Sequence, residues 1–476
     1  MPPLVVDFDG TLTPTDTLAE SVVKLVKQSP WNLVRLAMLL PKGKAVFKCF
    51  VAANTTFSAA TLPYREPLLH YLRNERGGGR RLILATASQR TIAEGVSAHL
   101  GIFDEVIATE TMNLKGRNKL DAIRKTVGED FAYAGDSAAD LPIWESAKAA
   151  ILVGTSDTVS AAVRRVLPVE AEFPRAPVQL RTWAKALRIH QWAKNLLIFV
   201  PVLTAFSFLD VAKLIDSVVA FLAFSFVASA TYVVNDLWDL ESDRIHPRKR
   251  RRPLASAEVP IVSALAISVV CLATGFVLAG MLSVHFVLML ALYLLGTISY
   301  TSILKQYVLV DVIVLSLLYT LRIVAGTVAI SVATSTWLLA FSLFLFLSLA
   351  LVKRCSELVA LEKAGGATTS GRDYRVNDLT VLWPIGVGTA MSAVVVFGLF
   401  ISSTATAARY GTPQALWLVA LGLVYWLSRL WIKTARGEMY DDPIVYAIQD
   451  RVSQIVVFFM TLTMIAAHYF EIGPIP

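Results

Sequence analysis

The chain has 476 residues, of which 55% are hydrophobic and 17% are charged. Soluble domains contain about 45–50% apolar and about 25% charged residues, so this composition disfavours a purely soluble enzyme and excludes a disordered chain. Lysine and arginine exceed aspartate and glutamate by 44 to 36, a net charge of +8. In a membrane protein such a surplus indicates basic cytoplasmic loops, and we expect no nucleic acid as a partner. Three widely separated cysteines, Cys49, Cys271 and Cys355, argue against a disulfide framework or a cysteine zinc site.

Residues 1–169 have the pattern of a soluble α/β domain. Apolar runs such as Leu4–Val6 and Leu82–Leu84 predict buried parallel strands, because strands covered on both faces are continuously apolar. Two prolines in the segment 170–178 indicate a linker. Within the α/β domain the run 31–40 (WNLVRLAMLL) is apolar at helical spacing, which favours a buried helix face over one that touches a membrane.

Residues 179–476 predict an all-α, multi-pass membrane domain of nine transmembrane helices. A helix needs about 20 apolar residues to cross a bilayer, and most of the apolar segments are this long. Basic residues gather in alternate loops, which places the N-terminus inside the inner (plasma) membrane and the C-terminus outside. No signal-peptide pattern precedes the first strand, so we expect the α/β domain to be cytoplasmic. The nine segments are 196–209, 214–234, 262–283, 285–303, 308–330, 337–352, 382–402, 415–432 and 452–470.

Two carboxylates follow the first predicted strand directly. Asp7 and Asp9 lie in the motif DFDGT, on a loop of the kind where open α/β sheets bind ligands. The first can attack phosphorus, and the second can move protons. Further along the chain come a hydroxyl and an amine that suit a phosphate, and two carboxylates that suit Mg²⁺. These residues are Thr86, Lys115 or Lys119, and then Asp136 and Asp140.

This ordered set resembles the phosphatase branch of the haloacid dehalogenase superfamily over about residues 1–165. The resemblance implies a Rossmann-like fold with a small helical cap at about residues 14–75. It also implies that Asp7 becomes an aspartyl phosphate and that Asp9 acts as the acid and base. An inactive relic of such a domain is the alternative, although Asp9, which a degraded phosphatase could lose, is present.

The same resemblance implies roles for the remaining polar residues. Thr86 and one lysine would bind phosphate: Lys119 fits a GxxK helix start, whereas Lys115 fits a KG variant. Mg²⁺ would be held by the main-chain carbonyl of Asp9 together with the side chains of Asp7, Asp136 and Asp140.

A second group of acids lies at the end of the second apolar segment. On a continuous helix Asp236, Asp239 and Asp243 fall at i, i+3 and i+7, which is one face. Carboxylates are costly in a membrane, but at a water-filled mouth Mg²⁺ can bridge them to substrate phosphates. The alternative is an acidic helix end that is only solvated.

A basic run at 246–253 follows the acidic motif. Such a run is often only a topology signal or attracted to lipid, but here it is placed to clamp a phosphorylated substrate. More polar side chains lie on the same predicted side of the membrane, and an arginine within a span is functional by default. The candidate substrate-binding residues are Lys194, Asn235, Lys249, Arg250, Arg252, Tyr300, Lys305, Arg322, Lys353 and Arg354.

The motif NDxxDxxxD with nine spans resembles the UbiA superfamily of intramembrane prenyltransferases. The chain departs from the family pattern in its second motif, DxxxD, because Asp311 is followed by Leu315. The segments RIHQWAKN and KRCSE are similar to the decaprenyl-phosphate phosphoribosyltransferase branch. That branch implies phosphoribosyl pyrophosphate (PRPP), a polyprenyl phosphate and Mg²⁺ at the three acids.

The two resemblances together imply a membrane phosphoribosyltransferase with a fused Mg²⁺-dependent phosphatase. The phosphatase would remove the 5-phosphate from the lipid-linked product, a cell wall glycolipid precursor. One alternative is an aromatic prenyltransferase that uses a polyprenyl diphosphate, beside an unrelated phosphatase; the incomplete motif at Asp311 counts against it. Another is a transporter or membrane scaffold, which the lack of an internal repeat disfavours. The expected partners are PRPP, polyprenyl phosphate and membrane lipids, and the oligomeric state is open.

Overall fold

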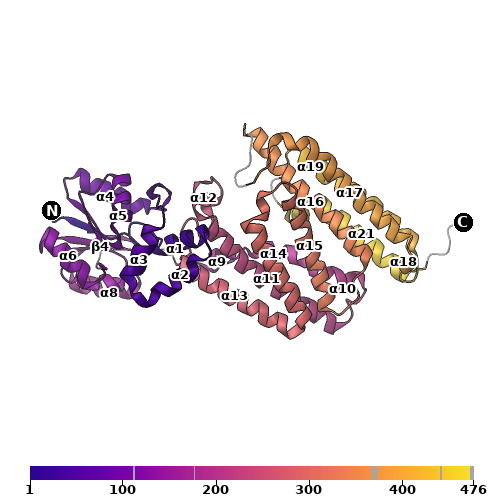
Figure 1. Ribbon diagram of the computed structural model, residues 1–476, viewed down its shortest axis with the longest axis horizontal. Helices are drawn as coiled ribbons and strands as arrows, with labels where there is room; N and C mark the ends of the chain where they lie inside the picture. Colours follow the sequence, from indigo (N-terminus) through magenta and orange to yellow (C-terminus); the bar gives the residue numbers. More distant parts are fainter. Residues whose placement is uncertain (111–112, 176, 367–371, 440–441, 472–476) are drawn as a thin grey trace. The chain divides into compact units, whose positions relative to one another are not determined.

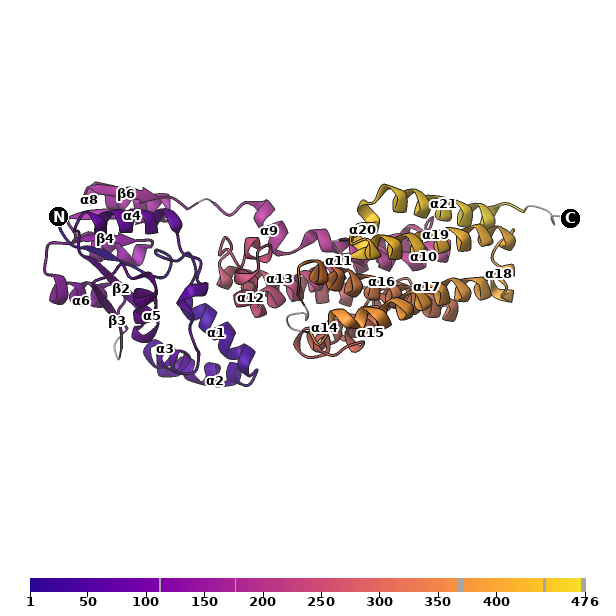
Figure 2. The ribbon, with the colours of Figure 1, turned by 90° about the horizontal axis from the view of Figure 1, so that it is seen from above.

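The computed structural model divides the chain into two units (Figures 1 and 2). The first unit is Met1–Leu187 with Tyr232–Val269, and the second is Arg188–Thr231 with Val270–Pro476. The structure describes residues 1–110, 113–175, 177–366, 372–439 and 442–471.

A six-stranded parallel sheet is the core of the first unit (Figure 1). Its strand order is β3-β2-β1-β4-β5-β6, so β1 lies inside the sheet and later strands are added on both sides of it. All the pairings are parallel, which confirms the predicted α/β domain. The strands are β1 (Leu4–Val6), β2 (Leu82–Gln89), β3 (Glu105–Thr109), β4 (Ala132–Gly135), β5 (Ala149–Val153) and β6 (Val169–Phe173).

Helices cover both faces of this sheet, because successive strand residues point to opposite sides. Leu4 and Val6 join one apolar cluster with Leu72 of α4, whereas Val5 joins the opposite cluster with Ile123 of α6. Burial on both faces explains why these strands are continuously apolar. The helices are α4 (Glu66–Gly77), α5 (Arg90–Leu100), α6 (Arg117–Val127), α7 (Leu141–Trp144) and α8 (Asp157–Val166).

The last strand corrects the predicted linker at 170–178. β6 pairs in parallel with β5, and Pro174 follows its end at Phe173. Half-buried and exposed residues alternate along VEAEF, as expected for an edge strand with one face toward solvent. The polar members of this alternation made the segment look like a linker.

A cap of three helices is separate from the layers of the sheet. One residue from each helix, Leu25, Leu36 and Val51, forms its small apolar cluster. Because α4 packs against the sheet instead, the cap is shorter than the predicted 14–75. The cap helices are α1 (Thr17–Gln28), α2 (Asn32–Leu39) and α3 (Lys44–Ala53).

The apolar run 31–40 is not buried, and the predicted core face is wrong. Within α2 only Asn32 and Leu36 are buried. A cluster to which each helix contributes one apolar residue can cover only one narrow face of α2. Of the other apolar side chains of the run, Leu39 is half-buried and the rest are exposed.

Within the described residues, eight helices are long and apolar enough to cross a membrane. The all-α architecture of the second half is as predicted, and α11 and α13 are shared between the two units. The candidate spans are Val211–Trp238 (α11), Ile261–Leu282 (α13), Val284–Ser302 (α14), Val310–Ala329 (α15), Thr336–Lys363 (α16), Val376–Ile401 with α17 (Leu379–Ile401), Pro413–Ala435 with α19 (Leu416–Ala435), and Arg451–Tyr469 (α21). The shorter helices are α9 (Leu180–Ala186), α12 (Leu240–Ile245), α18 (Thr404–Ala407) and α20 (Pro443–Gln449).

The predicted span 196–209 is not a long α-helix, so the expected nine helices are not confirmed. The chain forms the 3₁₀-helix η4 (Ile189–Phe199) and then the short helix α10 (Val200–Thr204). Pro201 has no N–H with which to continue a hydrogen-bond ladder from η4. Phe206, with a positive φ of 51°, follows the end of α10.

In the second unit α15, α16 and α17 run side by side, and α19 packs on α16 and α17 (Figures 1 and 2). Two hydrogen bonds join α16, α17 and α19. Ser348 of α16 donates to the carbonyl of Gly386 in α17 (2.9 Å), and the indole N–H of Trp431 in α19 donates to Ser348 (3.1 Å). A Cβ on Gly386 would lie 2.1 Å from a ring carbon of Trp431. The missing side chain therefore allows this close approach.

We expect Gly386→Ala to lower the thermal midpoint of the detergent-solubilised chain, because overpacking costs about 1–3 kcal/mol. Gly388→Ala is the matched control, since a Cβ there meets nothing within 4 Å and alanine favours the helix. Differential scanning fluorimetry on both variants measures the effect. Equal midpoints for the two variants would contradict the contact with Trp431.

Candidate functional site

Asp7 lies immediately after β1, between the carboxyl ends of β2 and β4. Strands are added on opposite sides of β1 at this point, and open α/β sheets bind ligands at such a position. The Asp7 N–H donates to the carbonyl of Ala134 at 2.9 Å, which fixes the loop to β4. Gly10, with φ of +81°, completes the turn, and a Cβ there would lie 2.2 Å from Oδ2 of Asp136. Glycine thus lets this loop approach the second acidic loop.

Three carboxylates meet at this edge of the sheet. Asp7, Asp136 and Asp140 each offer an oxygen within 4.8 Å of the others. Burial raises the pKa of Asp7, and burial followed by the charges of Asp7 and Asp140 raises the pKa of Asp136 to about 7. Crowded, buried carboxylates of this kind fit a hard divalent cation that prefers oxygen ligands.

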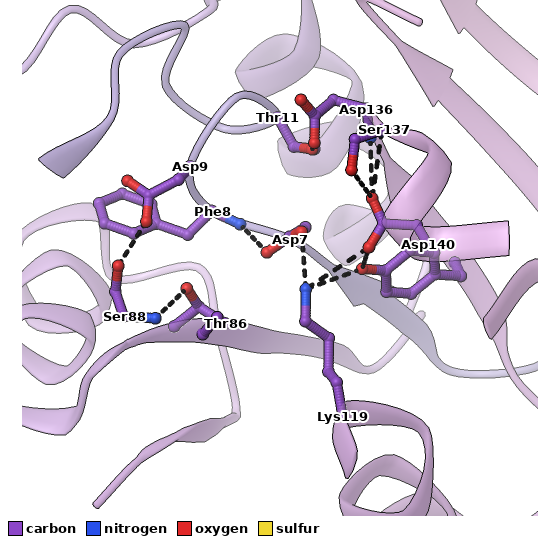
Figure 3. A network of polar contacts seen from close by, with 12 residues as sticks. Asp7, Phe8, Asp9, Thr11, Thr86, Ser88, Lys119, Asp136, Ser137 and Asp140 are labelled. Atoms are coloured by element: carbon purple, nitrogen blue, oxygen red, sulfur yellow. Dashed lines mark hydrogen bonds and ion pairs between the residues drawn. The ribbon is translucent and has the colours of Figure 1, made fainter. Parts of the chain in front are cut away.

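Lys119 lies between two of these acids (Figure 3). Its Nζ is 2.6 Å from Oδ2 of Asp7 and 3.7 Å from Oδ1 of Asp140. The lysine is 3% exposed, and the start of α6 at Gly116 sets its position. Lys115, the other predicted candidate, is exposed on the loop before that helix. Of the two, the structure brings Lys119 to the carboxylates.

Asp9 lies apart from the three acids and is held by two donors (Figure 3). Its Oδ1 accepts the N–H of Thr17 at 2.9 Å, and its Oδ2 accepts the hydroxyl of Ser88. Burial raises the pKa of Asp9 to about 6, and the Ser88 hydrogen bond opposes that rise. Thr86, buried on β2, accepts the N–H of Ser88 at 3.0 Å. Sequence reasoning found Thr86 but missed Ser88 two residues later.

Two basic residues near this site belong to no motif that the sequence reveals. Lys48 of α3 donates to the carbonyl of Ala87 and to Oδ1 of Asn113, both at 2.8 Å, and burial lowers its pKa. Arg65, just before α4, donates to the carbonyl of Gly10 at 3.0 Å. Both are positioned by chain packing that spacing alone does not reveal.

The predicted acidic face of the membrane half is broken between two helices. α11 ends at Trp238, and Asp239 is the half-buried residue before α12. Asp236 and Asp243 are nevertheless brought together, because Nη1 of Arg252 is 3.0 Å from Asp236 and 2.5 Å from Asp243. Both aspartates are buried. The single straight helix is therefore wrong, while two of its acids share one cation.

The neighbouring predicted residues are distributed around this pair. Nζ of Lys249 is 3.9 Å from Asp243, and Arg250 is exposed on the 3₁₀ turn η5 (Lys249–Arg251). Asn235 is half-buried in the last turn of α11. Instead of being a free phosphate clamp, Arg252 neutralises the acids in this structure.

Within the first unit, helix α1 contacts both Asp9 and the segment that carries the second group of acids. Its first residue, Thr17, binds Asp9, while Glu20, Lys24 and Lys27, at i, i+4 and i+7, share one face. Arg244 of α12 donates to Glu20 at 2.9 Å, and Lys24 is 2.6 Å from Glu241. The ammonium of Lys27 donates to the carbonyl of Trp238 at 2.5 Å, and so satisfies an acceptor at the end of α11.

A cationic centre lies in the second unit. Oδ2 of Asp442, the N-cap of α20, is 2.7 Å from Nζ of Lys194 and 3.2 Å from Nζ of Lys353. The hydroxyl of Tyr319 donates to the same oxygen, and the guanidinium of Arg322 lies 5.2 Å from the Tyr319 ring centroid. Two predicted cations, Lys194 and Lys353, thus meet at one acid, Asp442, which sequence reasoning missed, and a third, Arg322, lies over the Tyr319 ring beside them.

Arg322 is held by three further groups. Its Nε donates to Asn195 of η4 at 2.9 Å, Nη1 to the carbonyl of Leu318 and Nη2 to the hydroxyl of Tyr293 at 3.1 Å. These bonds fix the orientation of the guanidinium and tie η4 to α15.

Arg354 is fully buried, which contradicts a direct substrate contact. Its Nη2 is 2.6 Å from Asp311, Nη1 pairs with Glu357, and the hydroxyl of Tyr374 donates to Asp311. The single acid of the incomplete second motif is therefore neutralised inside the helix packing. Arg354 joins α16 to α15 and is structural.

Tyr300 and Lys305 lie at the end of α14 and in the turn that follows it. Tyr300 is half-buried in the last turn of α14, and Lys305 is half-buried in the 3₁₀ turn η6 (Leu304–Gln306). The structure places neither of them within the Asp442 cluster.

We expect Lys119→Met to destabilise the sheet domain by roughly 3–5 kcal/mol in the presence of EDTA, because it leaves buried carboxylates without their cation. Lys115→Met is the matched control, and a change at that exposed position should stay within about 0.5 kcal/mol. Urea unfolding of the solubilised chain, followed by pulse proteolysis, measures both. A similar loss in the two variants would refute the assignment of Lys119 to the carboxylates.

Two family models match the chain over separate regions. The model of the UbiA prenyltransferase family matches residues 197–465, and the model of the haloacid dehalogenase-like hydrolases matches residues 4–145. The first match covers the helical half, and the second covers most of the parallel sheet. These families indicate transferase activity in the helices and phosphatase activity in the sheet domain.

Individual proteins are similar either to nearly the whole chain or to about 60% of it. "Uncharacterized protein y4nM" from Sinorhizobium fredii is 38% identical over 458 residues, which cover 95% of this chain and 88% of that protein. A decaprenyl-phosphate phosphoribosyltransferase from Mycolicibacterium smegmatis is 30% identical over 298 residues, 60% of this chain and 92% of that protein. Among solved structures, a UbiA homolog from Archaeoglobus fulgidus bound to GPP and Mg²⁺ has a TM-score of 0.46 and 16% identity over 61% of this chain and 100% of that one. This chain belongs to the UbiA prenyltransferase family and has a haloacid dehalogenase-like hydrolase domain at its N-terminus.

Proposed function

We propose that the membrane half transfers 5-phosphoribose from PRPP to a polyprenyl phosphate and that the N-terminal domain removes the 5-phosphate of the product. The observation that carries the proposal is the charge of the second unit's polar centre. Lys194, Lys353 and Arg322 gather there, whereas the acid of the second motif, Asp311, is neutralised by Arg354. A reaction between two phosphorylated substrates needs such cations. The similarity to phosphoribosyltransferases over 60% of the chain supports it.

In the transferase, the chain's own residues would bind and orient the two phosphorylated substrates. Mg²⁺ held by Asp236, Asp239 and Asp243 would neutralise charge on the diphosphate that leaves the sugar. Lys249 and Arg250, exposed beside the acids, are available to PRPP phosphates. The lipid phosphate oxygen would form a bond to C1 of the ribose as the bond to pyrophosphate breaks, and apolar helix walls would exclude water.

In the phosphatase, Asp7 would attack the 5-phosphate and Asp9 would give a proton to the departing ribose oxygen. Asp9 would then take a proton from the water that attacks phosphorus in the aspartyl phosphate, which releases inorganic phosphate and restores Asp7. A pKa of about 6 suits a group that must both donate and accept a proton near neutral pH. Lys119 would neutralise charge on Asp7 and the phosphate. Mg²⁺ at Asp7, Asp136 and Asp140 would supply further neutralisation.

The proposal also includes the membrane topology. The N-terminal domain would be cytoplasmic, in the inner (plasma) membrane, and the C-terminus would lie outside. η4 and α10 have eleven and five residues, and at rises of about 2.0 and about 1.5 Å per residue they would extend about 30 Å. This is about the thickness of a bilayer's hydrocarbon core, so the segment would be a narrow ninth crossing. Its packing on α15 supports this, since a Cβ on Gly326 would lie 2.3 Å from the carbonyl oxygen of Ile198.

We expect Asp236→Asn to lower transfer from radiolabelled PRPP to polyprenyl phosphate by about 100-fold or more, because it removes a charge from the proposed metal site. Mass spectrometry of the lipid products in nanodiscs measures this. Glu258→Gln, an exposed acid that follows the same basic loop, is the control and should retain activity. Wild-type transfer from a prenyl diphosphate to an aromatic acceptor, with none from PRPP, would establish the alternative prenyltransferase.

We expect Asp7→Asn to accumulate the lipid-linked ribose 5-phosphate, whereas the wild type yields the dephosphorylated lipid. The amide cannot act as the nucleophile, while the transferase acids are unchanged. The control is Asp130→Asn, whose side chain is 80% exposed. Equal accumulation of the 5-phosphorylated lipid by wild type and Asp7→Asn would show that the phosphatase acts on something else.

A further inference from the structure

The cap of the phosphatase domain carries a concentrated apolar surface. We define the apolar cap surface as five large side chains within ten residues, with exposed fractions of 52–76%: Trp31 76%, Leu33 61%, Val34 52%, Met38 61% and Leu40 66%. Among the described residues of Met1–Leu187, only four other large apolar side chains are exposed: Met1, Val46, Val166 and Leu180. Soluble proteins rarely leave such a cluster uncovered.

Most of the apolar cap surface lies on α2, and the opposite face of this helix packs against the rest of the cap. Leu36 of α2 packs in the small cluster with Leu25 and Val51. The side-chain amide of Asn32 donates to the carbonyl of Leu25 at 2.8 Å. Asn32 and Leu36 are four residues apart, so they hold one face of α2 against α1 and α3, and the apolar side chains point away from the domain.

The charge of the surrounding chain is one-sided. Residues 21–65 contain seven lysines or arginines and no aspartate or glutamate. Arg35 lies among the apolar residues and Lys42 follows them, both exposed. A helix that combines bulky apolar residues, a tryptophan and basic residues is suited to the interface of an anionic membrane, where the basic groups reach the headgroups.

We infer that the apolar cap surface inserts into the headgroup region of the membrane that the chain itself spans. The eight candidate spans among the described residues keep a bilayer available to the chain, and the absence of acids from 21–65 favours anionic lipid over a second copy of this basic chain. The cap also borders the phosphatase site, because Thr17 of α1 binds Asp9 and Lys48 of α3 donates to the carbonyl of Ala87 on β2. The phosphatase would therefore take a phosphate monoester carried by a lipid, a substrate class that rests on the proposed function.

Spin labels test the surface directly. Met38→Cys is labelled in a Cys49→Ser background, since Cys271 and Cys355 are buried, and the full chain is placed in nanodiscs containing phosphatidylglycerol. Val166→Cys, 59% exposed in α8 of the same domain, is the matched control. We expect the label at 38 to be relaxed by oxygen and shielded from a water-soluble nickel chelate, and the label at 166 to show the reverse. Nickel access at 38 equal to that at 166 overturns the inference, as does shielding from both reagents, which would indicate a protein partner.

Activity tests the substrate class. We expect Leu33→Glu with Met38→Glu to lower hydrolysis of the lipid-linked ribose 5-phosphate in vesicles about tenfold, because the substrate's effective concentration falls. Hydrolysis of soluble p-nitrophenyl phosphate should stay within twofold, which shows that the domain is folded, and Val166→Glu should change neither rate. Equal loss on both substrates overturns the inference. A membrane-inserted label at 38 with no hydrolysis of the ribose lipid by the wild type would reject the proposed function and leave the membrane contact standing.

Discussion

Buried carboxylates need a cation, and this requirement organises several of the polar sites that the structure describes. An unpaired charge inside a protein or membrane is costly, and several of the acids are held beside a base. Lys119 forms an ion pair with Asp7, and Arg252 forms ion pairs with Asp236 and Asp243. Arg354 serves Asp311 at the core of the helices. The acids that remain in excess, such as Asp136 beside Asp7 and Asp140, are those best suited to a metal ion.

The difference between paired and crowded acids separates structural from functional groups. Asp311 and Arg354 are both fully buried and form an ion pair, and Tyr374 donates a hydrogen bond to Asp311, so these residues pack helices together. Asp442 instead holds two lysines that remain partly accessible, with 11% of Lys194 and 31% of Lys353 exposed. A phosphate could take the place of that carboxylate between the two ammonium groups, since it offers the same kind of oxygen.

Sequence reasoning could predict which acids lie close together where those acids follow strand ends. Asp7 follows β1, and Asp136 with Asp140 follows β4, so parallel pairing alone brings them together. The eight long apolar helices of the described residues could be predicted for a similar reason, because apolar length is a property of one segment. The failures concern contacts between distant segments: Lys194 and Asp442 are 248 positions apart, and no spacing rule connects them. Arg354 was assigned to the substrate for the same reason, because the sequence does not reveal that this residue pairs with an acid on α15.

Other predictions failed because the sequence does not show how much of an element's surface is covered by its neighbours. β6 was taken for a linker because an edge strand needs only one apolar face. The run 31–40 was assigned to a core because its periodicity is helical, but periodicity does not tell whether protein or lipid lies against the face. The break at Asp239 arises between two helices that share one acidic motif, and periodicity likewise does not reveal it.

The face of α1 formed by Glu20, Lys24 and Lys27 has a consequence for the fusion itself. Lys27 satisfies a main-chain acceptor at the end of α11, and Glu20 neutralises Arg244 next to Asp243. A transferase half expressed alone would leave that helix end and that guanidinium to water. The end of α11 and the whole of α12 thus belong to the same unit as α1, and a gene split between the two domains would separate them.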